Sequence, residues 1–237
     1  MTSARRFERP IVASEALWPV VLFDLDGTVI DSFDGIADSV RAAYGLIEEP
    51  LPSDEEVRSW IGPPLAETFF AKLSHRGSGT IEEALAEFRR VYLGGAALTA
   101  TLYEGMDSII SELRKAGVWV GLVTLKGRPI SIEISAHLGF GEHLHEVFGP
   151  IPGEPAPSKE AMVREALVMA GESSGVMVGD RANDIRAARG CGIDAVGVAW
   201  GFGSRDSLEE AGASIVADSP TDLAQVLGVE RLLSESE

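Results

Sequence analysis

The chain has 237 residues, of which 45% are hydrophobic and 24% charged, a globular composition that excludes wholesale disorder and collagen-like architecture. Its formal net charge of −17 disfavours binding to nucleic-acid backbones and anionic membranes. The single cysteine, Cys191, excludes an intrachain disulfide and a cysteine-cluster zinc site. No apolar run is long enough for a membrane helix or a signal sequence, so we expect a soluble cytoplasmic protein.

The first hundred residues predict one strand followed by helices. Residues 1–18 are polar and irregular, which indicates a loose tail. The apolar run at 20–23 is typical of a strand buried on both faces of a parallel sheet, and Gly27 then permits a tight turn. Ser53, with Glu56 three residues later, is typical of a helix start. Helical patterns lie at 34–44, from 53 onwards, at 65–73 and at 81–92. Residues 50–100 contain no convincing strand.

Strands and helices alternate along the remaining chain. Strands are predicted at 118–123, 175–178 and 195–198, and helices at 105–116, 130–138, 159–170 and 185–189. Repeated strand–helix units imply a parallel sheet with helices on both faces. We therefore expect an α/β fold: a Rossmann-like, doubly wound parallel sheet core formed by residues 19–32 and 103–237. A small α-helical domain, residues 33–102, is inserted in it.

Polar side chains follow three of the predicted strands. Asp24 and Asp26 follow the first, Thr124 the second and Asp180 the third. In open α/β sheets, ligands bind outside the carboxyl ends of the strands, so these side chains should converge. A lone aspartate after a strand is usually a turn former or a helix cap. Three aspartates and a threonine instead favour a site, in which a hard cation such as Mg²⁺ offsets the repulsion between carboxylates.

Residues 24–29, Asp-Leu-Asp-Gly-Thr-Val, resemble the first motif of the haloacid dehalogenase superfamily. Three further motifs match in order: Thr124 ends the second, Lys159 fits the lysine of the third, and residues 179–184 fit the acidic fourth. The helical insert resembles the cap of the phosphoglycolate-phosphatase-like group, as do residues 61–65 within it. Two positions depart from the common pattern. Leu125 stands where many relatives have Asn or Ser, and the lysine lies in Pro-Ser-Lys rather than Lys-Pro-x-Pro.

The resemblance implies a phosphatase that hydrolyses a phosphomonoester through an aspartyl-phosphate, with Mg²⁺ as cofactor. Asp24 would be the nucleophile, and Asp26 would protonate the leaving group and then activate water. Thr124 and Lys159 would bind phosphate oxygens. The metal would be held by Asp24, the carbonyl of Asp26, and Asp180.

Further residues receive supporting roles. Asp184, one helical turn after Asp180, would support Lys159 or a metal-bound water. The alternative is that it only caps a helix or forms a simple salt bridge. Candidates for contacting the organic part of the substrate are the cap residues Asp34, Arg58, Gly62 and Pro63. A solvated helix face explains Arg58 equally well, and a structural turn explains Gly62 and Pro63.

Several alternatives stay open. A phosphomutase of the same superfamily would use the same aspartyl-phosphate and second acid. A receiver-like phospho-signalling domain also places Asp, Thr and Lys around magnesium, but the helical insert and Asp26 argue against it. The expected partner is a small phosphorylated metabolite, such as phosphoglycolate, a sugar phosphate or a nucleotide. We expect no nucleic acid or membrane partner, and a monomer or homodimer.

Overall fold

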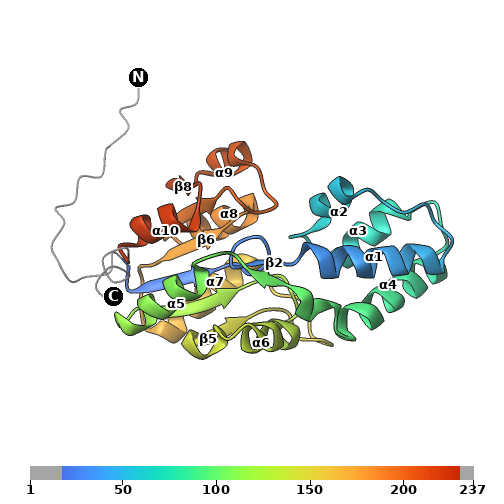
Figure 1. Ribbon diagram of the computed structural model, residues 1–237. Helices are drawn as coiled ribbons and strands as arrows, with labels where there is room; N and C mark the ends of the chain where they lie inside the picture. The colour runs from blue at the N-terminus through green and yellow to red at the C-terminus, as the bar shows by residue number, and fades with distance from the viewer. Residues whose placement is uncertain (1–17, 230–237) are drawn as a thin grey trace, which may run out of the picture.

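The computed structural model describes residues 18–229, so residues 1–17 of the predicted tail lie outside the described part (Figure 1). Its larger part is a six-stranded sheet in which every neighbouring pair of strands is parallel. The order is β5-β4-β1-β6-β7-β8, with bounds β1 (Val20–Phe23), β4 (Trp119–Val123), β5 (Glu146–Phe148), β6 (Val176–Gly179), β7 (Asp194–Val198) and β8 (Ile215–Ala217). The strand order reverses beside β1, and such a switch point is where open α/β sheets bind ligands.

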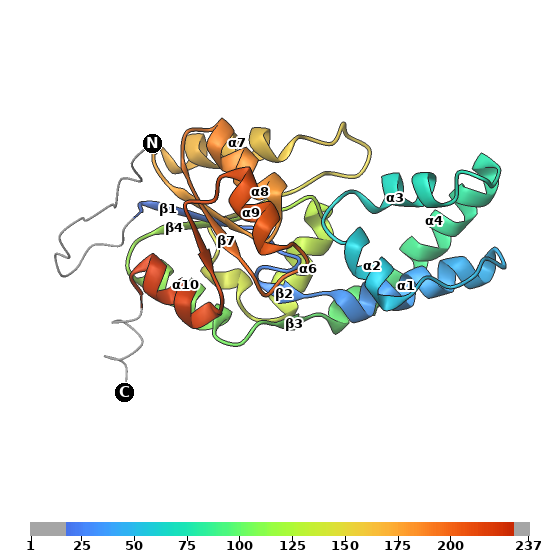
Figure 2. The ribbon, with the colours of Figure 1, turned by 90° about the horizontal axis from the view of Figure 1, so that it is seen from above.

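Alternate residues of β1 face opposite layers of helices. Val21 and Phe23 belong to a core shared with α5 (Met106–Lys115), α6 (Arg128–His137) and α10 (Pro220–Leu227). Val20 and Leu22 belong to a core shared with α7 (Lys159–Ala170), α8 (Ala182–Gly190) and α9 (Arg205–Ala211). Figure 2 shows this sheet and its helices from above. The predicted doubly wound α/β fold is confirmed.

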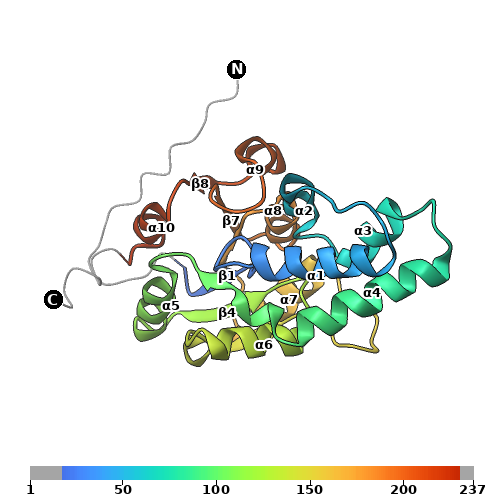
Figure 3. The same ribbon diagram turned by 45° about the vertical axis from the view of Figure 1, so that its right-hand side comes forward.

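Four helices between β2 (Ile30–Asp31) and β3 (Thr101–Leu102) form a group of their own beside the sheet (Figures 2 and 3). They are α1 (Phe33–Leu46), α2 (Asp54–Trp60), α3 (Leu65–Lys72) and α4 (Ser78–Leu93), followed by the short 3₁₀ helix η1 (Ala96–Thr99). The strands β2 and β3 pair antiparallel, which brings the start and the end of this insertion together. We call α1–α4 and η1 the cap.

The cap has an aromatic core. Tyr44, Trp60, Phe69, Phe88 and Tyr92 lie in successive ring contacts with centroids 5.4–6.4 Å apart. Aromatic pairs in these tilted, edge-on and stacked arrangements stabilise a fold beyond the area they bury. These ring contacts therefore join all four helices of the cap to one another.

Local signals explain where several elements begin. The side chain of Ser53 accepts a hydrogen bond from the backbone of Glu56, whose carboxylate accepts one from the backbone of Ser53, so the predicted start of α2 is confirmed. The strands β5 and β8 were not predicted, since three residues are too few to show a pattern. Among residues 18–229, no helix combines the length and the apolar character needed to cross a membrane.

Candidate active site

Three neighbouring strands deliver polar side chains to one edge of the sheet. Asp24 follows β1, Thr124 follows β4 and Asp180 follows β6, and β1 pairs with both of the other strands. All three residues are buried. A buried polar group is costly unless it has a partner, so this arrangement requires compensating contacts.

Lys159 provides the positive charge at this edge. It begins α7, where the Ser158 side chain accepts a hydrogen bond from the backbone of Ala161 and so fixes the start of the helix. The Lys159 ammonium lies 2.7 Å from Asp24 Oδ1 and also donates to Asp184 Oδ1 on α8. This contact fits the partnership with Lys159 expected of Asp184, and the alternative of a helix cap fits as well, because Asp184 Oδ2 accepts a hydrogen bond from the backbone of Arg181 at 2.9 Å.

The carboxylates of Asp24, Asp180 and Asp184 form a buried acidic cluster, in which one oxygen of each lies within 4.8 Å of the others. Asp180 Oδ2 accepts hydrogen bonds from the backbone of Phe202, at 2.7 Å, and of Gly203. Asp180 Oδ1 is buried and has no hydrogen-bond partner among the described residues. Carboxylate oxygens are the ligands that Mg²⁺ prefers, so the unpaired oxygen and the excess negative charge fit such an ion.

Backbone passes so close to Asp180 that side chains are excluded there. Gly27 has a φ of +82°, and a Cβ at this position would lie 2.4 Å from Asp180 Oδ2. A Cβ at Gly203 would lie 1.8 Å from the Asp180 carbonyl oxygen. The turn predicted at Gly27 is confirmed, and both glycines are required by the close approach of backbone to the acidic cluster.

Asp26 lies beside the cluster, and its side chain has a different partner. The ammonium of Lys126 forms an ion pair with Asp26, 2.8 Å from Oδ1, and donates a hydrogen bond to the hydroxyl of Tyr92 on α4. The backbone N–H of Lys126 donates to Thr124 Oγ1 at 3.1 Å. The third carboxylate of the acidic cluster is therefore that of Asp184 and not that of Asp26. Metal binding by the backbone carbonyl of Asp26 stays a prediction.

A cavity of about 330 Å³ opens onto Asp24 between the sheet edge and the cap. It is lined by Asp24, Gly62, Pro63, Pro64, Leu125, Lys159, Arg181, Ala182, Asn183 and Asp184. Gly62 and Pro63, two of the expected cap contacts, are therefore at the cavity. The other two lie elsewhere: Asp34 is exposed on α1, and the guanidinium of Arg58 stacks on Phe33 at 3.8 Å.

The model of the haloacid dehalogenase-like hydrolase family matches residues 21–198, a segment that contains the acidic cluster, Lys159 and the cap. The chain belongs to this family. The predicted superfamily is confirmed, and with it the expectation of an enzyme of the hydrolase class.

Several relatives resemble this hydrolase over most of its length. Tyrosine-protein kinase PtkA of Mycobacterium tuberculosis (strain ATCC 25618 / H37Rv) is 34% identical over 215 residues, 89% of this chain and 72% of PtkA. A 5'-nucleotidase of Pseudomonas aeruginosa is 28% identical, covering 92% and 96% of the two chains. A phosphoglycolate phosphatase of Vibrio parahaemolyticus is 29% identical, covering 89% and 96%. The solved structure of a "predicted phosphatase" from Clostridium acetobutylicum has a TM-score of 0.79 at 26% identity, covering 92% and 100%.

Two contacts of this hydrolase were missed by sequence reasoning. Lys126 was overlooked although it stands two residues after Thr124, because only its burial beside Asp26 distinguishes it from a surface lysine. Arg181 was read only as part of the fourth motif. Its guanidinium donates to the backbone carbonyls of Ile61 and, at 3.3 Å, Arg58, and so links the core to the cap.

Burial disfavours charge in the acidic cluster of the hydrolase. It raises the pKa of Asp24 to about 8, an effect that Lys159 opposes and the carboxylates of Asp184 and Asp180 reinforce. Burial, together with Asp184, raises the pKa of Asp180 to about 6. A cation bound between these carboxylates would favour their charged forms and so lower both pKa values.

These shifts predict how the stability of the metal-free protein depends on pH. Carboxylates of an unfolded chain titrate near pH 4, so between about pH 4 and 8 the folded state binds more protons than the unfolded state. The free energy of unfolding should consequently fall as the pH rises through this range. Urea unfolding in excess chelator should show this slope, and Asp24→Asn should reduce it. A free energy of unfolding that rises steadily from pH 5 to 8 in excess chelator would contradict the raised pKa values of Asp24 and Asp180.

Proposed function

We propose that this hydrolase is a Mg²⁺-dependent phosphatase that hydrolyses a small-molecule phosphomonoester through an aspartyl-phosphate at Asp24. One observation carries the proposal: Asp24 is held by Lys159 within a buried acidic cluster and lines a cavity. Phosphoryl transfer needs little beyond positioning and charge stabilisation, which such a cluster provides with a cation. The names of the 5'-nucleotidase and phosphoglycolate phosphatase relatives support the same reaction class.

In the first step, a carboxylate oxygen of Asp24 attacks phosphorus and the bond from phosphorus to the ester oxygen breaks. Asp26 gives its proton to the leaving oxygen. The Lys159 ammonium, already beside Asp24, and the Thr124 hydroxyl bind the phosphate oxygens. The alcohol then leaves while the phosphoryl group stays on Asp24.

In the second step, water attacks the phosphorus of the aspartyl-phosphate and Asp26 takes the proton of that water. The bond from phosphorus to the Asp24 oxygen breaks, which releases inorganic phosphate and regenerates the Asp24 carboxylate and the protonated side chain of Asp26. Asp24, Asp180 and the carbonyl of Asp26 are the proposed ligands of Mg²⁺, which when bound neutralises the negative charge of the phosphate.

The cavity supports a small substrate. Its volume of about 330 Å³ suits a metabolite rather than a protein domain. We assign the chemistry to the core and the enclosure of the leaving group to the cap. Gly62 and Pro63 line this cavity, which supports their proposed contact with the organic part of the substrate.

A second candidate function is transfer of the phosphoryl group to an acceptor other than water. The 34% identity to a protein named a tyrosine-protein kinase favours it, and a phosphomutase would be a further case. A kinase and a phosphomutase would each have to keep water away from the phosphorylated Asp24. Hydrolysis is the simpler proposal, because the role proposed for Asp26, two residues after Asp24, is to activate water.

The test is phosphate release from a panel of phosphomonoesters, containing phosphoglycolate, sugar phosphates and nucleoside monophosphates, with Mg²⁺ and with excess chelator. We expect hydrolysis that requires the metal and falls at least about 100-fold in chelator, since an unneutralised phosphate meets three carboxylates. A parallel reaction with ATP and a tyrosine peptide measures transfer to a hydroxyl. Peptide labelling without release from any monoester would replace the phosphatase by a kinase.

A further inference from the structure

Lys126 is a buried lysine whose two partners come from different parts of the protein. Its side chain is 8% exposed, and its ammonium lies 2.8 Å from Asp26 Oδ1 in the core. The same ammonium donates to the hydroxyl of Tyr92, in the last turn of α4 in the cap, and lies 4.9 Å from the centre of the Tyr92 ring. Core and cap therefore share one cation at the side chain of Asp26.

This cation is held by its partners and not by solvent. Burial alone would lower the pKa of Lys126, but Asp26 and Tyr92 raise it above the usual range. A buried ammonium is tolerated only when it is paired and hydrogen-bonded, so its position is fixed by these two groups. Tyr92 is in turn fixed by its stack on Phe88, with ring planes 14° apart.

We propose that Lys126 is a positioning residue that orients the Asp26 carboxylate toward the water of the second step, and that Tyr92 makes this orientation depend on the position of the cap. The inference rests on the proposed function, in which Asp26 takes the proton of that water. Lys126 touches neither phosphate nor water in this role, and it acts through Asp26.

The cap dependence follows from the connections of the three residues. Asp26 and Lys126 each lie three residues beyond the end of a strand, and these strands, β1 and β4, are neighbours in the core sheet. Tyr92 is carried by the cap, which joins the core through β2 and β3. When the cap lies against the core, the Tyr92 hydroxyl fixes the ammonium in place. A displaced cap withdraws that contact, so efficient water activation is confined to the closed protein.

The two chemical steps provide the test. With p-nitrophenyl phosphate the phenolate leaves without needing a proton, so phosphorylation of Asp24 does not depend on Asp26. Dephosphorylation still does. In Lys126→Met we expect a normal burst of nitrophenol, one equivalent per enzyme, followed by dephosphorylation roughly 10- to 100-fold slower than in the wild type, the usual cost of a misplaced catalytic group. The phosphoenzyme should accumulate, and Lys126→Arg should restore part of the rate.

Tyr92→Phe tests the link to the cap. Losing one hydrogen bond should slow dephosphorylation roughly 3- to 10-fold with the burst retained. In the Lys126→Met background the same change should have no further effect, because coupled residues are not additive. The matched control is Tyr44→Phe, another buried tyrosine in the aromatic core of the cap, which should leave both steps unchanged.

The outcomes separate this inference from the proposed function. Wild-type protein that forms no phosphoenzyme and releases no phosphate overturns both. Wild-type turnover combined with unchanged dephosphorylation in Lys126→Met and Tyr92→Phe overturns the positioning role alone. Additive effects of the two changes overturn the role of Tyr92. If Lys126→Met does not fold, Tyr92→Phe and Lys126→Arg decide the matter, because each keeps the buried site nearly filled.

Discussion

Replacing Lys159 with methionine is expected to lower the free energy of unfolding of the metal-free protein by about 3–5 kcal/mol. The ammonium contacts both Asp24 and Asp184, and its side chain is 4% exposed. Methionine fills much of the same volume but leaves two buried carboxylates without their shared counter-charge. Urea unfolding in excess chelator measures the loss, since added metal would partly replace the missing charge.

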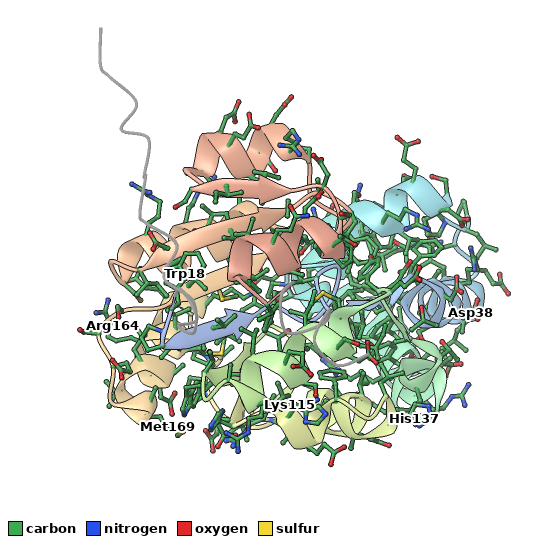
Figure 4. All side chains as sticks on the ribbon, turned by 60° about the vertical axis from the view of Figure 1, so that its left-hand side comes forward. Trp18, Asp38, Lys115, His137, Arg164 and Met169 are labelled. Atoms are coloured by element: carbon green, nitrogen blue, oxygen red, sulfur yellow. The ribbon has the colours of Figure 1, made fainter. Side chains whose placement is uncertain are left out.

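The matched control is Lys115→Met on α5, which Figure 4 labels. Lys115 also forms an ion pair, 2.6 Å from Glu112, but its side chain is 66% exposed, so its removal should cost at most about 1 kcal/mol. The double variant Lys159→Met with Asp184→Asn should recover part of the lost stability. Equal losses in the two single variants would show that the buried site does not depend on its lysine.

The variant Asp24→Asn should reduce turnover by about 10⁴-fold or more, the scale seen when a catalytic nucleophile is removed. An amide does not form the phosphoenzyme, so labelling of the protein by substrate should vanish as well. Stability should not fall in the metal-free protein, because the change removes a carboxyl whose charge is disfavoured by burial.

Phosphate release and acid-stable labelling of the protein measure the two effects of Asp24→Asn, and the unfolding curve shows that the fold is intact. Asp34→Asn is the control, since Asp34 is exposed and is not among the residues lining the cavity. Multiple turnovers by the folded Asp24→Asn variant would exclude Asp24 as the nucleophile.

The parts of the fold that sequence predicted were those determined by local pattern. An apolar run followed at once by Asp24, and another followed by Asp180, indicated buried parallel strands with polar ends, and the sheet brings these ends together. The position of Lys159 at the start of a predicted helix indicated that its side chain would lie near the edge of the sheet that carries Asp24 and Asp180. The three-residue strands β5 and β8 were missed because so short a run does not show a period.

The contacts that sequence did not predict all join segments distant in the chain. Lys126 pairs with Asp26 across two strands and with Tyr92 across the boundary with the cap. Arg181 reaches the carbonyl of Ile61 in the same way. The spacing of residues along the chain does not predict these contacts, because the contacts depend on how the cap packs against the core. The position of Arg58, which stacks on Phe33 and is not among the residues lining the cavity, follows from the same packing.

The strand order also determines when this site can come into existence. The strand β1 ends at Phe23, whereas its neighbour β6 begins only at Val176, so the acidic cluster depends on a contact between segments synthesised far apart in time. Pairings of such wide sequence separation are slow to form, while the helices of the cap can associate early from nearby residues. During synthesis on the ribosome, we therefore expect the cap to form first. The nascent chain should gain any affinity for phosphate or metal only after β6 has emerged and inserted beside β1.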